Sequence, residues 1–299
     1  MRKIFNSIVA FITLFLISGC GEGRVDITDA SYSPEIVINA YIFGGQKVQD
    51  IKITRNIPLT QNIDTSKIIL TDAIVRLIDL SNNKEYLLSY NPLKFSFEYM
   101  GSDLFIDYGK SYKIDVQATI DGKNLHASST TTVPLSGLKA DIHDLGTMVY
   151  RETDVYGNVK KINVSFRPSE NSIATILSIV ALDASTNSFI YNNYYYIETD
   201  TQKIEHALDR YKQNYTFQLG IAPGIQDFTV TIDWFTIWFY GKYRVIIYAA
   251  DRNFYDYFIT AKNVMELDGN FHEPKMHIEG DGIGVFGSAV TDTVYFDIQ

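Results

Sequence analysis

Residues 113–120 read Lys-Ile-Asp-Val-Gln-Ala-Thr-Ile and alternate strictly between polar and apolar side chains. A period of two places the four apolar residues on the core side of a β-strand and the polar residues in water. Asp121-Gly122 follows, and both residue types adopt the positive φ angles of a tight hairpin turn. The run 124–133 then returns and stops at Pro134. This stretch predicts an antiparallel hairpin, and with it an all-β fold.

Similar runs precede this hairpin, at residues 36–43, 48–54, 73–80 and 85–90. Gly44-Gly45 separates the first two and predicts a hairpin turn there, as do residues 81–84 between the last two. We expect about seven strands over residues 35–134, forming an immunoglobulin-like or transthyretin-like β-sandwich. The single cysteine excludes the Cys–Trp–Cys framework of a true immunoglobulin domain.

Pro134-Leu135-Ser136-Gly137 predicts a domain boundary, followed by a second, aromatic-rich β domain at 138–299. Its expected strands are 159–166, 173–183, 188–197, 216–219, 228–239, 243–249 and 292–298. One packing helix is expected after Asp251, a good N-cap residue, because Phe254, Phe258, Ala261 and Met265 recur at helical spacing.

The N-terminus is typical of an export signal. Arg2 and Lys3 precede an apolar run from Ile8 to Ile17 that is too short to span a bilayer. Leu16-Ile17-Ser18-Gly19-Cys20 resembles the lipobox of bacterial lipoproteins. The resemblance implies that residues 1–19 are removed and that Cys20 carries the lipid, with 20–34 as a tether. An ordinary secretory signal with an incidental cysteine is the simpler alternative.

Composition limits the partners. The formal charge is −9, which becomes −11 once Arg2 and Lys3 are removed. An acidic chain lacks the electrostatic footprint of a nucleic-acid-binding protein and is not drawn to anionic lipid. The lipid on Cys20 would therefore make the membrane contact. With that cysteine modified, no thiol remains for a disulfide, a metal site or a nucleophile.

Several stretches together resemble one Bacteroidetes lipoprotein family, the domain of unknown function number four-two-four-nine. They are residues 34–42, 53–59, 70–77, 108–114, 131–134 and 282–287, in this order along the chain. The resemblance implies an outer-membrane lipoprotein, often encoded beside a TonB-dependent receptor. It implies an accessory role in nutrient capture or receptor assembly, and it supplies no catalytic residue.

Motifs for catalysis or cofactor binding are weak. Residues 282–287 (Gly-Ile-Gly-Val-Phe-Gly) fit the dinucleotide-binding pattern, but a helix and a later acidic residue are missing, so a bend or bulge before the last strand explains them better. His272 and His277 lack the spacing of a zinc-protease helix. The loop 141–144 (Asp-Ile-His-Asp) could offer oxygen and imidazole to a metal, but a solvated loop is the simpler interpretation. Asp268, Glu279 and Asp281 lie near glycines but lack the spacing of a calcium loop. We expect no enzyme, no cofactor and no metal.

Aromatic residues offer the one candidate ligand site. In a strand, Trp234, Trp238 and Tyr240 would share a face on which a sugar ring or a peptide could stack. The alternative, which we favour, is that both tryptophans belong to the core, because a strand that is apolar on both faces is usually buried. Within Tyr194-Tyr195-Tyr196, at least one ring is expected at the surface.

These observations leave three hypotheses. The first is a non-enzymatic outer-membrane lipoprotein that serves a TonB-dependent transporter. The second is a free-standing lipoprotein that binds a glycan or peptide through Trp234 and Trp238. The third, a hydrolase with an unrecognised site, has no supporting motif.

Overall fold

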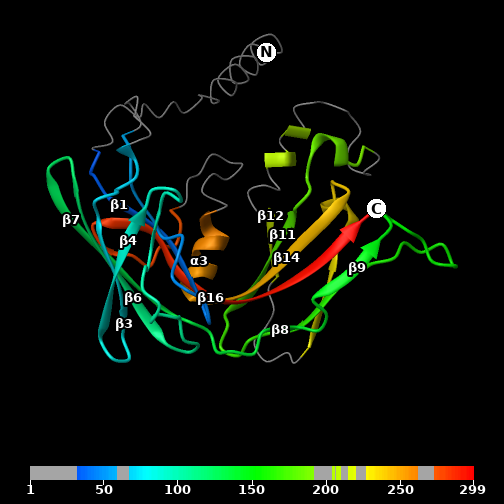
Figure 1. The fold of residues 1–299 in the computed structure, drawn as a ribbon, viewed down its shortest axis with the longest axis horizontal. Helices are drawn as coiled ribbons and strands as arrows, with labels where there is room; N and C mark the ends of the chain where they lie inside the picture. The colour runs from blue at the N-terminus through cyan, green and yellow to red at the C-terminus, as the bar shows by residue number, and fades with distance from the viewer. Residues whose placement is uncertain are drawn as a thin grey trace, which may run out of the picture. The chain divides into compact units, whose positions relative to one another are not determined.

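Strands dominate the chain, and they form three sheets (Figure 1). The structure is a computed structural model. It describes residues 32–58, 67–191, 204–205, 207–209, 215–219, 227–261 and 273–299. The all-β sandwich fold and its packing helix are confirmed. Within the described residues, no helix is both long and apolar enough to cross a membrane.

The hairpin that opened the sequence argument is present. Strand β6 (Ser111–Ile120) pairs antiparallel with β7 (Lys123–Thr132), and Ile120 lies opposite Lys123. Asp121 and Gly122 form the turn with φ angles of 51° and 77°. Ile114, Val116 and Ile120 are buried, as the period of two predicts.

This hairpin lies in a six-stranded sheet of order β15-β7-β6-β3-β4-β5. The other strands are β3 (Ile74–Asp79), β4 (Lys84–Asn91), β5 (Ser96–Glu98) and β15 (Glu279–Gly280). β3 and β4 pair antiparallel across the predicted turn at 81–84. At the far edge, Ile51 bridges to Phe97 and connects this sheet to the next one.

The second sheet has seven strands, of which six follow the order β12-β11-β14-β16-β1-β2. They are β12 (Tyr215–Leu219), β11 (Ala174–Ala181), β14 (Gly241–Ala250), β16 (Gly282–Ile298), β1 (Ile36–Phe43) and β2 (Lys52–Arg55). The seventh, β9 (Asp144–Met148), pairs in parallel with the end of β16.

Strand β16 joins the two parts of the chain that the sequence divides at 134–138. Its first half pairs in parallel with β1, and its second half pairs antiparallel with β14. Figure 1 shows this long strand in red, running beside helix α3 and β14. Residues 34–299 form one compact unit, so the two predicted β domains are parts of one body.

The glycines at 282–287 lie inside β16, not in a bend before it, and they permit close approach. Gly284 has a φ of 112°, and a Cβ there would lie 2.1 Å from the carbonyl oxygen of Ile38 on β1. A Cβ on Gly287 would lie 2.9 Å from the Cα of Phe254. The motif therefore serves packing of a strand against β1 and a helix, as glycine in a strand often does.

The packing helix α3 (Arg252–Ala261) begins where predicted. The Oδ1 atom of Asp251 accepts a hydrogen bond from the backbone N–H of Phe254 at 3.0 Å, which is an N-cap interaction. Met265 lies outside the described residues.

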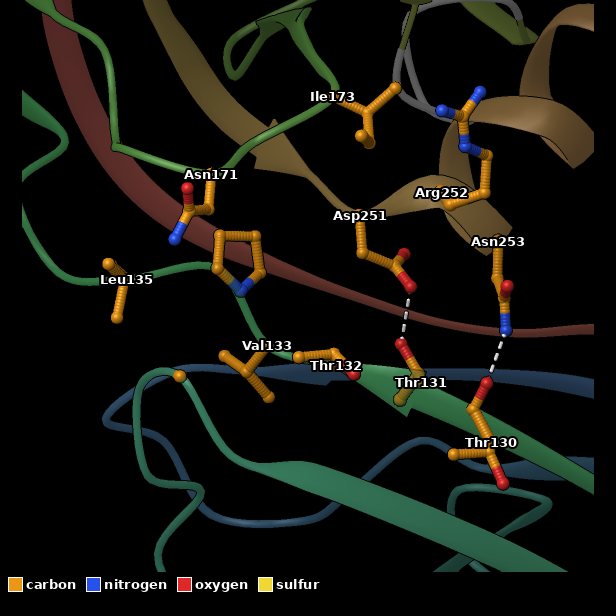
Figure 2. Close-up of a pocket in the computed structure, with 12 residues that line it drawn as sticks. Thr130, Thr131, Thr132, Val133, Leu135, Asn171, Ile173, Asp251, Arg252 and Asn253 are labelled. Atoms are coloured by element: carbon orange, nitrogen blue, oxygen red, sulfur yellow. Dashed lines mark hydrogen bonds between the residues drawn. The ribbon is translucent and has the colours of Figure 1, made fainter.

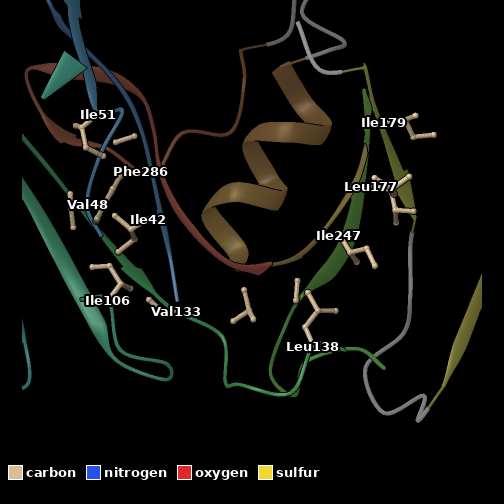
Figure 3. Packing of buried hydrophobic residues seen from close by; sticks show 14 of the residues in the cluster. Ile42, Val48, Ile51, Ile106, Val133, Leu138, Leu177, Ile179, Ile247 and Phe286 are labelled. Atoms are coloured by element: carbon tan, nitrogen blue, oxygen red, sulfur yellow. The ribbon is translucent and has the colours of Figure 1, made fainter. Parts of the chain in front are cut away.

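A third sheet, β13-β10-β8, completes the C-terminal part. Its strands are β8 (Lys139–Ala140), β10 (Ile162–Arg167) and β13 (Phe228–Ile232). Buried side chains of this sheet and of the seven-stranded sheet belong to one hydrophobic cluster. Figure 3 shows part of that cluster, with Ile42 and Phe286 on β1 and β16, and Leu177 and Ile247 on β11 and β14.

Three strand predictions were wrong in detail. The connection at Gly44-Gly45 is no tight hairpin, because β1 and β2 pair only from Asn39–Lys52 outward. Residues 186–188 are a 3-10 helix, and 192–197 lie outside the described residues. The strand predicted at 228–239 ends at Ile232.

Candidate interaction surface

The aromatic segment 234–240 is not a strand. Trp234–Thr236 form a 3-10 helix after Asp233, closed by a hydrogen bond from the backbone N–H of Ile237 to the carbonyl of Trp234 at 3.0 Å. Alternating side chains of this segment therefore do not share a face. The predicted strand face of Trp234, Trp238 and Tyr240 does not form.

Both tryptophans are half-buried and packed against the core. The indole N–H of Trp234 donates to the carbonyl of Lys160 at 2.7 Å, and that of Trp238 donates to the carbonyl of Phe235 at 2.5 Å. Ile237 and Phe239 between them are fully buried. The rings are thus held in place by their own polar atoms, which is how Trp usually satisfies its donor.

Tyr150 packs against two aromatic rings of this segment. Its ring makes edge-to-face contacts with Trp234 at 5.3 Å and with Tyr240 at 6.3 Å between ring centres. Its backbone N–H donates to the carbonyl of Gln299 at 2.7 Å. Burial raises the pKa of the Tyr150 hydroxyl. Tyr240 is exposed at the edge of this group.

Tyr150 stands at the base of an ordered hairpin over residues 149–160. Thr153 bridges to Val159, and the N–H of Lys160 donates to the carbonyl of Glu152 at 2.8 Å. At the tip, the Oδ1 of Asp154 accepts from the N–H of Tyr156 at 2.8 Å and from the N–H of Asn158 at 2.9 Å. These backbone donors, Asn158 first, lower the pKa of Asp154. The tip therefore has a defined shape.

That ordered tip holds two large apolar side chains in water. Val155 is 94% exposed and Tyr156 is 87% exposed. Exposed apolar side chains that lie together in one patch mark interaction sites, and Tyr and Trp are enriched in protein interfaces. We define the Tyr150 surface as Tyr150, Val155, Tyr156, Trp234, Phe235 and Tyr240.

Sequence reasoning found Trp234 and Tyr240 of this surface and missed Tyr150, Val155 and Tyr156. Residues 154–158 read Asp-Val-Tyr-Gly-Asn, and Asp, Gly and Asn are typical turn residues. That signal predicts a turn with two apolar residues at its tip. No local sequence pattern connects this turn to Trp234, which lies in the connection between β13 and β14.

A cavity of about 310 Å³ lies between the end of β7 and the start of α3 (Figure 2). The buried Asp251 carboxylate reaches it, and burial raises the pKa of that group. Its oxygens accept from Thr131 Oγ1 at 2.5 Å and from the N–H of Ser288 at 3.0 Å. Asn253 Nδ2 donates to the carbonyl of Thr130 at 2.7 Å. These bonds connect β7, β16 and α3, so Asp251 has a structural role.

Each histidine that the structure describes pairs with one carboxylate, and His126 Nε2 lies 2.6 Å from Asp115. His143 Nε2 lies 3.1 Å from Asp292, and His277 Nε2 lies 3.0 Å from Asp256. No group of three metal-ligating side chains occurs among the residues that the structure describes. His272 and Asp268 lie outside those residues, as do Tyr194, Tyr195 and Tyr196.

The fold and this surface define an all-β sandwich protein with an exposed aromatic surface. The chain belongs to the family described as Domain of unknown function (DUF4249), which matches residues 23–293. No curated protein matches the chain. Cys20 and the predicted tether to residue 31 lie outside the described residues.

Three solved structures to which this chain is similar are all distant from it. The chain is 13% identical to a 1.5-MDa bacterial ice-binding adhesin, over 89% of this chain and 65% of that one, with a TM-score of 0.23. It is 9% identical to a tetra-tandem repeat of a large adhesion protein, over 88% and 49%, with a TM-score of 0.21. It is 9% identical to a segment of two fibronectin type-III domains of chicken tenascin, over 72% of this chain and 89% of that one, with a TM-score of 0.17. The chain thus spans about two-thirds of the length of the ice-binding adhesin structure and about half of the length of the tandem-repeat structure.

Proposed function

We propose that this protein is a non-enzymatic lipoprotein of the outer membrane, anchored through lipid on Cys20. In this proposal it docks to a TonB-dependent receptor and serves nutrient capture or assembly of the receptor. The lipobox-like stretch ending at Cys20 supports the anchor. The family resemblance supports a TonB-dependent receptor as the partner, because it implies a lipoprotein that is often encoded beside such a receptor.

The observation that carries the docking role is the exposed tip of the 149–160 hairpin. The side chains of Val155 and Tyr156 would each bury most of their apolar area in a complex. Complete burial of such a side chain is worth about 1.5–3 kcal/mol relative to leaving it exposed. Because Asp154 already holds the tip in shape, binding would cost little ordering entropy.

A free-standing role in binding a glycan or peptide is the second candidate. Tyr240 favours it, because its exposed ring contacts Tyr150, and Phe235, the residue after Trp234, is also exposed. This function would need no membrane receptor, and it would depend on the aromatic base of the surface more than on the hairpin tip.

A pulldown of the tagged full chain from its native outer membrane in mild detergent, read by mass spectrometry, tests the first proposal. The key variant is the double substitution Val155→Ser and Tyr156→Ser. Leu93→Ser is the matched control, because Leu93 is 89% exposed in the turn between β4 and β5. Cys20→Ala removes the anchor.

We expect a TonB-dependent barrel in stoichiometric amount with the wild type and the Leu93→Ser variant, and its loss with the hairpin variant. Loss with Cys20→Ala as well would show that membrane attachment contributes. Recovery of the wild type without a barrel would contradict the docking role. Binding of a glycan or peptide array that Tyr240→Ala abolishes would then favour the second candidate.

A further inference from the structure

Two buried polar atoms without hydrogen-bond partners lie on one face of the seven-stranded sheet. They are the Oγ of Ser178 on β11 and the Nε of Arg244 on β14. The residues that the structure describes contain only one other such side-chain atom, on Ser96 in a different sheet. Buried polar groups are almost always hydrogen-bonded, so each exception needs a physical explanation.

The strand register brings the two residues together. Ser178 lies opposite Ile246, and Val180 lies opposite Arg244, so Ser178 and Arg244 are diagonal neighbours on adjacent strands. Such neighbours have Cα atoms about 7–8 Å apart, within reach of an arginine side chain. Their face is opposite to the one on which Tyr243, Val245 and Ile247 are fully buried.

The guanidinium of Arg244 has no carboxylate partner among the described residues. No ion pair connects it to an acidic side chain. Two charged residues share this face: Lys242, whose Nζ lies 5.3 Å from the ring centre of Tyr295, and Asp297, which lies diagonally across from Arg244 on β16 without forming an ion pair with it. Arg244 as a whole is only partly buried, but its Nε is buried without a partner, and a planar guanidinium matches a carboxylate through paired N–H donors.

Apolar and aromatic side chains surround these two groups. Tyr295 lies directly opposite Arg244 on β16, and Tyr248 is four residues further along β14 on the same face. The positive charge of Arg244 lowers the pKa of the Tyr248 hydroxyl, although burial raises it more. Ile176 and Val180, also on this face, are buried.

We infer that this face binds a small carboxylic acid with an apolar body. Arg244 would donate N–H groups to the carboxylate, and Ser178 would donate its hydroxyl to the same group. Ile246 and the rings of Tyr248 and Tyr295 would contact the apolar body. Both unsatisfied atoms then gain a partner that the described residues do not provide. This site is independent of the Tyr150 surface.

Isothermal titration of the full chain in mild detergent tests the inference, with benzoate and hexanoate as probes. Benzamide and hexanamide are the uncharged controls of the same shape. We expect the carboxylates to bind at least tenfold more tightly than the amides. Arg244→Gln should weaken binding of benzoate at least tenfold, and Ser178→Ala should weaken it severalfold. Arg167→Gln is the matched control, because Arg167 is an exposed arginine of another sheet.

Melting curves separate a binding role from a structural one. Without probe, Arg244→Gln should melt at or above the wild-type temperature, because it removes a buried Nε donor that has no hydrogen-bond partner. With benzoate, only the wild type and the Arg167→Gln variant should gain stability. Absence of binding by the wild type, equal binding of benzoate and benzamide, or a lower melting point of probe-free Arg244→Gln would each overturn the inference. Absence of binding, or equal binding of benzoate and benzamide, is expected if water alone forms hydrogen bonds with Ser178 Oγ and Arg244 Nε.

Discussion

Replacing Asp251 with Ala should destabilise the protein more than removal of an exposed carboxylate such as Asp227. The Asp251 side chain is 6% exposed and lies where β7, β16 and α3 meet. Its Oδ1 accepts from the N–H groups of Phe254 and Ser288, both at 3.0 Å. Its Oδ2 accepts from Thr131 Oγ1 at 2.5 Å.

The magnitude follows from these three bonds. Loss of an N-cap costs about 1 kcal/mol. The buried N–H of Ser288 would lose its acceptor, which costs about 1–3 kcal/mol. The Thr131 hydroxyl keeps a bond to Ser288 Oγ at 2.8 Å, so its loss is small. Removing a desolvated carboxylate offsets part of the total. We expect a net loss of about 2 kcal/mol in the free energy of unfolding.

Asp251→Asn should cost much less, about 1 kcal/mol or below, because Asn is an equally good N-cap and keeps one oxygen acceptor. It should also change the pH dependence. Burial raises the pKa of Asp251 above its ordinary value of 3.8, so the folded state holds this proton to higher pH than the unfolded state. The contribution of Asp251 to stability therefore falls as pH rises from 3.8 through the raised folded pKa, and Asp251→Asn should abolish that slope.

Urea unfolding followed by tryptophan fluorescence, at several pH values, provides the assay. Asp227→Ala is the control, because Asp227 is exposed and pairs with Arg167 at 3.4 Å. It should change stability by less than about 0.5 kcal/mol. The reasoning is refuted if Asp251→Ala costs no more than this control, or if Asp251→Asn costs as much as Asp251→Ala.

Three further substitutions test the packing of β16 and the Tyr150 surface. Gly284→Ala should cost several kcal/mol or prevent folding, because the new Cβ would lie 2.1 Å from the Ile38 carbonyl oxygen. Gly122→Ala should cost only about 1 kcal/mol, because the space around Gly122 is open. Urea unfolding compares the stabilities of the two variants. Tyr150→Phe should be nearly neutral in the same assay, whereas Tyr150→Ala should cost about 3 kcal/mol through loss of its ring contacts; equal costs would contradict this. Asp154→Ala should speed proteolytic cleavage in the 154–158 turn without lowering global stability, and an unchanged cleavage rate would show that the side chain does not hold the tip.

Local patterns predicted the elements whose partners are close in sequence. The β6–β7 hairpin follows from a period of two and a turn pair that accepts positive φ, and α3 follows from a capping residue and helical spacing. Gly44-Gly45 carried an equally good turn signal, yet β1 takes β16 as its parallel neighbour. Local sequence cannot specify a partner that is more than 240 residues away.

The aromatic segment failed for a related reason. Trp234 and Trp238 fit a strand and a 3-10 turn equally well as residue types. In the observed structure, their indole N–H groups donate to the carbonyls of Lys160 and Phe235. Tyr150 and Trp234 are 84 residues apart, and their contact depends on how two connections meet at one end of a sheet.

By itself, the sequence determined the all-β class, the hairpin at 111–132, the capped helix and the family, because each depends on dihedral preference, periodicity or residue order. Tertiary structure alone decided that β16 joins both parts of the body, that Tyr150 contacts Trp234, and that Ser178 and Arg244 are diagonal neighbours on adjacent strands. These arrangements depend on strand register and close packing between distant segments, and no local pattern encodes either.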